Sequence, residues 1–108
     1  MKSIVIASML IATASKAEFL TGNELLNRMN GDHSQQMMAI GYVIGAHDAL
    51  RGAGHCSPLN ITVGQINEMV KNHLERNLEN RHRSADVHIM YVLNKAWPCP
   101  KKNGGSDV

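Results

Sequence analysis

The sequence has 108 residues and a formal net charge of +2, with 11 Lys and Arg against 9 Asp and Glu. This length is enough for one modest hydrophobic core and too short for two domains. The weak charge and the presence of only one Phe, two Tyr and one Trp argue against nucleic-acid binding, which uses clustered cations and stacking aromatic rings.

The first segment has the three parts of a secretory signal peptide. Lys2 supplies a positive start, residues 4–14 form an apolar run, and Ser15-Lys16-Ala17 is a small-residue cleavage site. The apolar run is about half of the roughly 20 residues that span a bilayer, so a retained membrane anchor is the weaker alternative. We expect the Sec pathway to export the chain and residues 1–17 to be removed, which leaves 91 of the 108 residues, with 9 basic and 9 acidic side chains.

Two helices are predicted in the first half of the mature chain. The first runs from about Gly22 to Asn30, and Thr21-Gly22-Asn23-Glu24 fits a capping box at its start. The second runs from Ser34, its predicted cap, to about Arg51. Gly41 and Gly45 lie four residues apart in this helix and permit close approach of another helix. We expect them to pack inside the domain, with a helix-mediated homodimer as the alternative.

Two further helices are predicted in the second half. Thr62-Val63-Gly64-Gln65 fits a second capping box, and the apolar residues that follow recur at intervals of three and four as far as Leu78. Ser84 opens the last helix, with Asp86 in its first turn, and Pro98 ends it. No apolar run in the mature chain is long enough to span a membrane.

The only two cysteines are Cys56, in a turn-rich connection between the second and third helices, and Cys99, between two prolines. In an exported chain such a pair usually forms a disulfide, and two free thiols are the alternative. We therefore predict an all-α, compact bundle of about four helices with one disulfide over residues 18–100, followed by a disordered tail at 101–108.

Candidate catalytic and metal sites are weak in this sequence. No two of the six histidines have the i,i+4 spacing of a helical metal site: His33, His47, His55, His73, His82, His88. His47 and Asp48 are neighbours that point about 100° apart on a helix, so we expect no directed acid–base pair and a partly buried, hydrogen-bonded Asp48. No serine has a nucleophile-elbow motif. The sequence predicts no cofactor, no metal and no enzymatic activity.

The densest exposed charge cluster lies before the last helix, at residues 79–83. Such a cluster is usually a solvated loop. It is also the best candidate for a protein contact, because Arg and His pair well with an acidic or polar cleft. We predict that the partner-binding residues are Glu79, Arg81, His82 and Arg83.

The order of several short motifs resembles the Rap/Tai immunity family over nearly the whole mature chain. These motifs are Phe19-Leu20-Thr21-Gly22-Asn23-Glu24-Leu25-Leu26, Gly41-Tyr42-Val43-Ile44-Gly45 with Asp48-Ala49, Thr62-Val63-Gly64-Gln65, Arg81-His82 and Trp97-Pro98-Cys99-Pro100. The resemblance implies a periplasmic, all-helical immunity protein with no catalytic group. It would bind a peptidoglycan amidase delivered by type VI secretion and occlude its active site.

One departure from the family concerns cysteines. Members often carry an additional cysteine pair, where this chain has Met29 and Ala39. The Met29 and Ala39 side chains would then have to fill the space of the missing disulfide. The change also indicates a divergent member, whose partner need not be an amidase. The alternative functions are a phage or host envelope factor that regulates a lytic cell-wall enzyme, and a small hydrolase.

Overall fold

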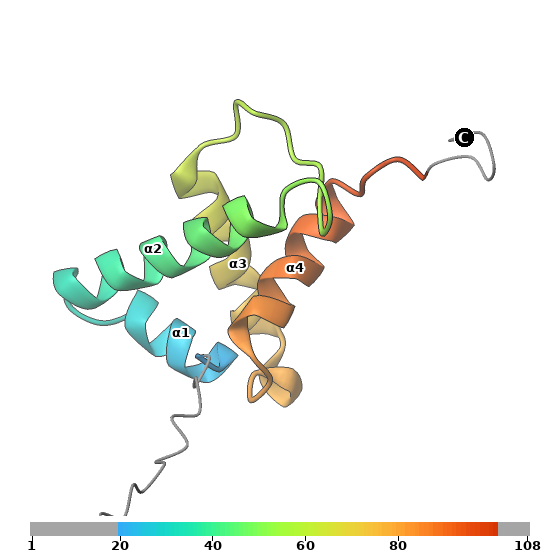
Figure 1. Cartoon of the computed structure of the whole chain (residues 1–108). Helices are drawn as coiled ribbons and strands as arrows, with labels where there is room; N and C mark the ends of the chain where they lie inside the picture. The colour runs from blue at the N-terminus through green and yellow to red at the C-terminus, as the bar shows by residue number, and fades with distance from the viewer. Residues whose placement is uncertain (1–19, 102–108) are drawn as a thin grey trace, which may run out of the picture.

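The computed structural model describes residues 20–101 as a bundle of four α-helices (Figure 1). These are α1 (Gly22–Met29), α2 (His33–Leu50), α3 (Val63–Arg76) and α4 (Ala85–Ala96), with a short 3-10 helix, η1 (Leu78–Asn80), before α4. The described residues contain isolated β-bridges but no strand, which confirms the all-α prediction. The predicted signal peptide at 1–17 and nearly all of the predicted tail lie outside the described residues.

The two predicted capping boxes lie at the starts of α1 and α3, and only the box of α1 has both of its hydrogen bonds. The Thr21 hydroxyl accepts from the Glu24 amide at 3.1 Å, and the Glu24 carboxylate accepts from the Thr21 amide at 2.9 Å, so the first box is complete. In α3 the Thr62 hydroxyl accepts from the Gln65 amide at 3.1 Å. Each helix thereby satisfies a backbone donor that would otherwise have no partner.

The starts of the other two helices differ from the predictions. Asp32, and not Ser34, caps α2, because its carboxylate accepts from the Gln35 amide at 2.9 Å. A carboxylate at this position also interacts favourably with the helix dipole, which a hydroxyl does not. Ser84 precedes α4 as predicted, but its hydroxyl donates to the Asp86 carboxylate and caps no backbone amide.

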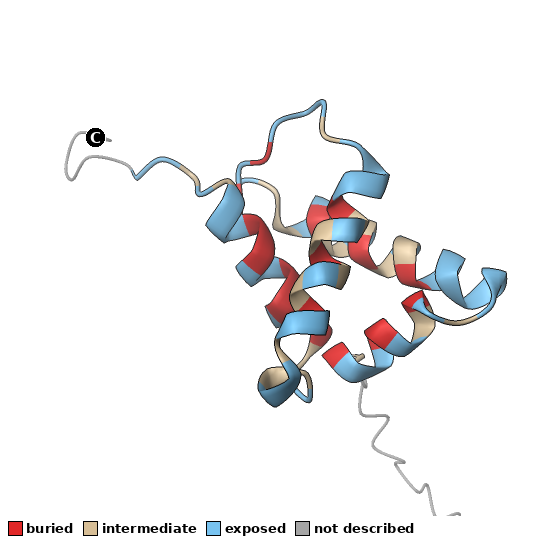
Figure 2. Ribbon diagram, turned by 180° about the vertical axis from the view of Figure 1, so that it is seen from behind, coloured by how far each residue is buried: buried red, intermediate tan, exposed pale blue. Residues whose placement is uncertain are grey.

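Every pair of the four helices is in contact, and the apolar residues that they share form one core. Figure 2 shows the buried residues along the inward faces of the helices. The core residues are Leu25, Leu26, Met29, Ala39, Val43, Ile66, Val70, Leu74, Ala85, Ile89, Val92 and Leu93. Met29 and Ala39, which were predicted to pack where a further cysteine bridge could have been, both belong to this core. No described helix has the length and apolar character of a membrane span.

The predicted close packing at Gly41 and Gly45 is wrong. Both glycines are exposed, and a Cβ added to either would meet no atom within 4 Å. Helix α2 instead buries Ala39, Val43 and His47, which recur every four residues on another face. Because α2 is apolar on nearly all sides, its sequence did not show which face would be buried. A homodimer through α2 stays a prediction.

Gly22 is a glycine whose lack of a side chain the fold requires. Its amide donates to the Arg83 carbonyl at 2.8 Å, and the next amide, of Asn23, donates to the Arg81 carbonyl at 2.8 Å. These bonds bring the loop before α4 against the start of α1. A Cβ at Gly22 would lie 2.8 Å from the Arg81 carbonyl oxygen and 3.0 Å from the His88 and Leu74 side chains.

We therefore expect Gly22→Ala to lower the free energy of unfolding by about 1–3 kcal/mol, the usual cost of overpacking. Gly45→Ala is the matched control, because its Cβ would meet nothing within 4 Å. This control should stabilise the protein by up to about 1 kcal/mol, since Ala favours a helix interior over Gly. Urea denaturation of the two variants measures both effects, and equal shifts would contradict the proposed contact.

Candidate functional site

The predicted contact loop, residues 79–83, begins inside η1 and ends just before α4. Glu79, His82 and Arg83 are exposed, as a contact surface requires. Arg81 is partly buried, and its Nε donates to the Asn23 Oδ1 at 3.1 Å while its Nη1 donates to the Leu74 carbonyl at 3.2 Å. Arg81 therefore braces the contact loop against α1 and α3, and the other three predicted residues face solvent.

The backbone of the contact loop is held in one conformation from several sides. The Arg81 and Arg83 carbonyls accept from the first two amides of α1, and the Asn80 carbonyl accepts from Nε2 of His88 in α4 at 2.8 Å. Bonds to two different helices limit the conformational freedom of the loop. Such preorganisation lowers the entropy that a loop loses when it binds a partner.

Behind this loop, His73 of α3 and His88 of α4 form a hydrogen-bonded pair. The Asn80 carbonyl can only accept, so Nε2 of His88 donates to it. Nδ1 of a neutral His88 then accepts from Nε2 of His73 at 2.9 Å. Nδ1 of His73 in turn accepts from Nδ2 of the Asn77 side chain at 3.1 Å. This pattern satisfies every ring nitrogen when both histidines are neutral.

The environment of His73 opposes its protonation. Burial lowers the pKa of His73 below its ordinary value, and the positive fields of His88 and Lys95 lower it further. A second proton on His73, at Nδ1, would also point at Nδ2 of the Asn77 side chain, which is itself a hydrogen-bond donor. The folded protein therefore favours neutral His73.

We expect the protein to lose stability as the pH falls through about 6.5, the ordinary pKa of His, because unfolded His73 then binds a proton that the folded form resists. The free energy of unfolding should be lower at pH 5.5 than at pH 7.5. His73→Gln should reduce this difference, and His82→Gln, on the exposed loop, should not. Urea denaturation of the three proteins at both pH values tests this, and an unchanged difference in His73→Gln would contradict it.

A groove runs between α3 and α4, next to the contact loop. It consists of two adjoining hollows, of about 260 and 540 Å³, which share His73, Asn77 and Tyr91 in their walls. We call this the α3–α4 groove. The remaining lining residues are Met69, Asn72, Arg76, Asn80, Arg83, Val87, His88, Val92, Lys95 and Ala96. The groove begins at Arg83 of the contact loop, so the two features form one surface.

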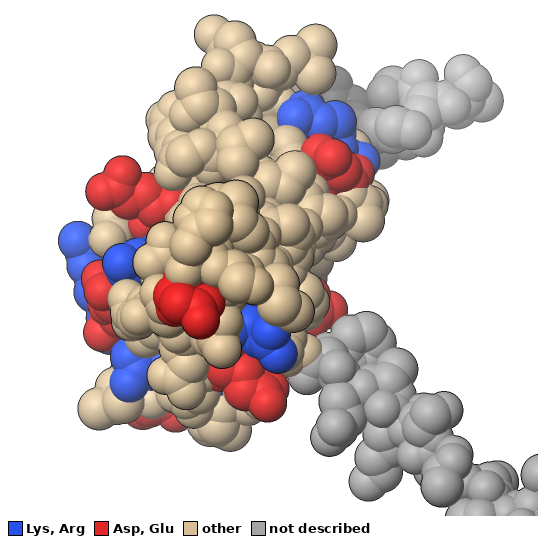
Figure 3. All heavy atoms as spheres, turned by 90° about the vertical axis from the view of Figure 1, so that its left-hand side faces the viewer, with Lys and Arg blue, Asp and Glu red and all other residues tan. Residues whose placement is uncertain are grey.

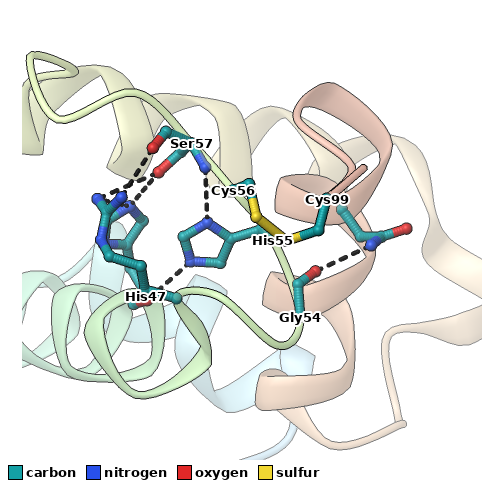
Figure 4. The surroundings of a disulfide bond; sticks show 8 residues. His47, Gly54, His55, Cys56, Ser57 and Cys99 are labelled. Carbon is teal, nitrogen blue, oxygen red and sulfur yellow. Dashed lines mark hydrogen bonds between the residues drawn. A yellow bond between two sulfur atoms is a disulfide. The ribbon is translucent and has the colours of Figure 1, made fainter. Parts of the chain in front are cut away.

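The predicted disulfide between Cys56 and Cys99 is confirmed (Figure 4). It joins the α2–α3 connection to the segment after α4, with Cα atoms 4.8 Å apart. The Cys56 amide also donates to the Trp97 carbonyl at 2.8 Å. The bridge thus fastens the long connection to the end of the last helix.

Beside the bridge lies a polar cluster that corrects two predictions about His47 and Asp48. Asp48 is exposed, not partly buried, yet its carboxylate lies 3.1 Å from Nδ1 of His47. A directed pair therefore does form between these neighbours, because the short Asp side chain turns back along the helix surface. Nε2 of buried His47 lies 2.8 Å from the Ser57 hydroxyl.

The order Asp48, His47, Ser57 is that of a serine hydrolase triad, but the surroundings of Ser57 favour a structural role. Ser57 is only 4% exposed, and Arg51 donates to its hydroxyl at 3.3 Å and to its carbonyl at 2.7 Å. A nucleophile must reach its substrate and a site for the oxyanion. Neither hollow of the α3–α4 groove is lined by Ser57. The cluster instead ties the disulfide-bonded connection to α2.

Spacing in the sequence did not reveal the histidine pairs. His47 and His55 have ring centroids 4.5 Å apart, and His73 contacts His88 across two helices. A rule based on i,i+4 spacing finds pairs within one helix only. Among residues 20–101, no three His, Cys, Asp or Glu side chains are grouped as metal ligands.

Comparison with known proteins identifies the family of this chain. The family model described as Rap1a immunity proteins matches residues 21–99, which include all four helices and both cysteines. No curated protein and no solved structure matches the chain. A match over most of the sequence shows the family. The chain therefore belongs to the Rap1a immunity proteins, a family whose function is immunity against a secreted effector.

Proposed function

We propose that this immunity protein works in the periplasm and protects the cell wall from a peptidoglycan amidase delivered by type VI secretion. The family membership supports protection against a secreted toxin. The signal-peptide pattern of residues 1–17 and the Cys56–Cys99 disulfide support export to an oxidising compartment, where the toxin would meet the wall.

Inhibition would occur by occlusion of the toxin's active-site cleft. The observation that carries this proposal is the contact loop, which is exposed at Glu79, His82 and Arg83 and is anchored through its backbone to α1 and α4. A loop that is rigid before binding can enter a cleft with little loss of conformational entropy. The immunity protein needs to supply no reacting group, only a surface that fits.

The experiment that tests this function is a protection assay. Cells that export the full chain, and cells that make residues 18–108 in the cytoplasm, are challenged with cell-wall amidases directed to the periplasm. The exported protein should prevent lysis by at least one amidase, and the cytoplasmic form should not. The variant His82→Glu with Arg83→Glu should protect less while its circular dichroism is unchanged. Lysis at the same rate with and without the exported protein, for every amidase tried, would disprove the proposal.

A further inference from the structure

We propose that the α3–α4 groove takes up an acidic segment of the toxin, whose carboxylates pair with Arg76, Arg83 and Lys95. This inference rests on the proposed function, because it names the chemistry of the toxin surface that the immunity protein recognises. It adds a second contact to the contact loop, since the groove extends from Arg83 along α4 to Ala96.

The first argument is the charge of the groove walls. The lining residues include three cations, Arg76, Arg83 and Lys95, and no Asp or Glu. Among residues 20–101, no carboxylate forms a salt bridge with any of these cations. The mature sequence has equal numbers of acidic and basic side chains, so this local excess of positive charge is a property of the fold. Such a surface attracts and orients a negatively charged partner.

Figure 3 shows how charged side chains are distributed over one face of the protein. On the face drawn in Figure 3, Lys and Arg alternate with Asp and Glu, and neither sign forms a continuous field. A partner with an acidic segment gains more from a surface without carboxylates, such as the lining of the α3–α4 groove, than from a surface of mixed charge. The mixed face would contribute little, because exposed pairs in water are worth at most about 1 kcal/mol.

The second argument concerns the floor of the groove. Nε2 of His73 and both ring nitrogens of His88 are already engaged in hydrogen bonds within the protein, so the pair presents ring surface and these nitrogens do not compete for the incoming carboxylates. The lowering of the pKa of His73 by Lys95 is consistent with a positive field at this place. The positive charge of the groove therefore comes from Arg76, Arg83 and Lys95, which are exposed and can reach a bound chain.

The third argument concerns the type of partner. Tyr91 is half exposed in the middle of the groove, and the Lys95 Nζ lies 5.6 Å from its ring centroid. Tyr and Arg, together with Trp, are enriched among the residues that contribute most of the binding energy in protein interfaces. From Val87 to Ala96 the groove follows α4 for about 14 Å, at 1.5 Å per residue, which is the length of roughly four extended residues. The site thus fits a short acidic peptide segment.

The test uses the mature protein and a capped tetraglutamate peptide as the probe, with NMR amide shifts as the readout at low ionic strength. Tetraglutamate should shift the amides of His73, Asn77 and Tyr91, and a capped tetralysine peptide should not. The variant Arg76→Glu with Lys95→Glu should lose at least two thirds of these shifts, and the milder Arg76→Gln with Lys95→Gln should lose part of them. Lys71→Glu with Lys101→Glu has the same net charge change outside the groove and should bind as the wild type does.

Shifts that map to another face, or equal losses in the Lys71 and Lys101 variant, would overturn the groove proposal. The same variants in the protection assay separate it from the proposed function. If the exported protein protects cells and the Arg76→Glu, Lys95→Glu variant protects them equally well, the groove proposal fails and the immunity function stands. If tetraglutamate binds the groove but no amidase is inhibited, the amidase function fails. When an inhibited toxin is in hand, the double reversal should weaken its binding at least tenfold.

Discussion

Replacement of Cys56 and Cys99 by serine should lower the free energy of unfolding by about 4 kcal/mol, the chain-entropy value for a loop of this length. The disulfide joins residues separated by 43 positions, so without it the unfolded chain gains much conformational freedom. Small domains are stable by about 5–15 kcal/mol in total. The bridge is therefore expected to supply a large share of the stability, and urea denaturation of wild type and variant measures it.

A reduction experiment controls for the serine side chains. Wild type treated with dithiothreitol should unfold at the same urea concentration as the serine variant, and the reductant should not change the variant. A difference below about 1 kcal/mol between oxidised and reduced wild type would show that the other anchors suffice, among them the Cys56 amide bonded to the Trp97 carbonyl. The large effect would also explain why a cytoplasmic form of the protein should not protect cells.

The second large effect should come from His55→Leu. His55 is fully buried, its Nε2 donates to the His47 carbonyl at 2.8 Å, and its Nδ1 accepts from the Ser57 amide at 3.2 Å. Leucine leaves both backbone groups without a partner in the interior. We expect a loss of about 2–4 kcal/mol in the free energy of unfolding, because each buried unpaired group costs about 1–3 kcal/mol and added apolar contact offsets part of it.

Two variants make this prediction specific. His55→Gln retains one donor and one acceptor and should lose clearly less stability than His55→Leu. His33→Leu changes an exposed histidine in the first turn of α2 and should have little effect. Thermal melts and urea denaturation of the three variants provide the comparison. Equal losses in the Leu and Gln variants at His55 would show that packing, and not the two hydrogen bonds, sets the cost.

Taken by itself, the sequence determined the features that depend on residues close together in the chain or on the number of cysteines. Thr21 and Thr62 begin helices because their hydroxyls reach amides only three residues away. The partner of Cys56 was predictable because an exported chain with two cysteines offers only one bridge. Four helices follow from apolar spacing, although α3 ends at Arg76, two residues before the predicted end, where η1 follows.

Only the tertiary structure decided the features that depend on distant residues. Arg81 lies in an exposed charged segment of the sequence, yet its guanidinium spans from Asn23 to Leu74. The exposure of Gly41, the contacts of Gly22 and the His73–His88 pair were equally absent from local patterns.

The positive groove is the clearest such case. Arg76, Arg83 and Lys95 are scattered along the sequence, and only the packing of α3 beside α4 places them around one groove whose lining contains no carboxylate. The physical reason is that periodicity fixes which residues share a face of one helix, whereas the rotation and pairing of helices depend on how the whole core packs. The sequence thus predicted an exported, disulfide-bonded helical bundle, and the fold decided which of its surfaces carries the charge.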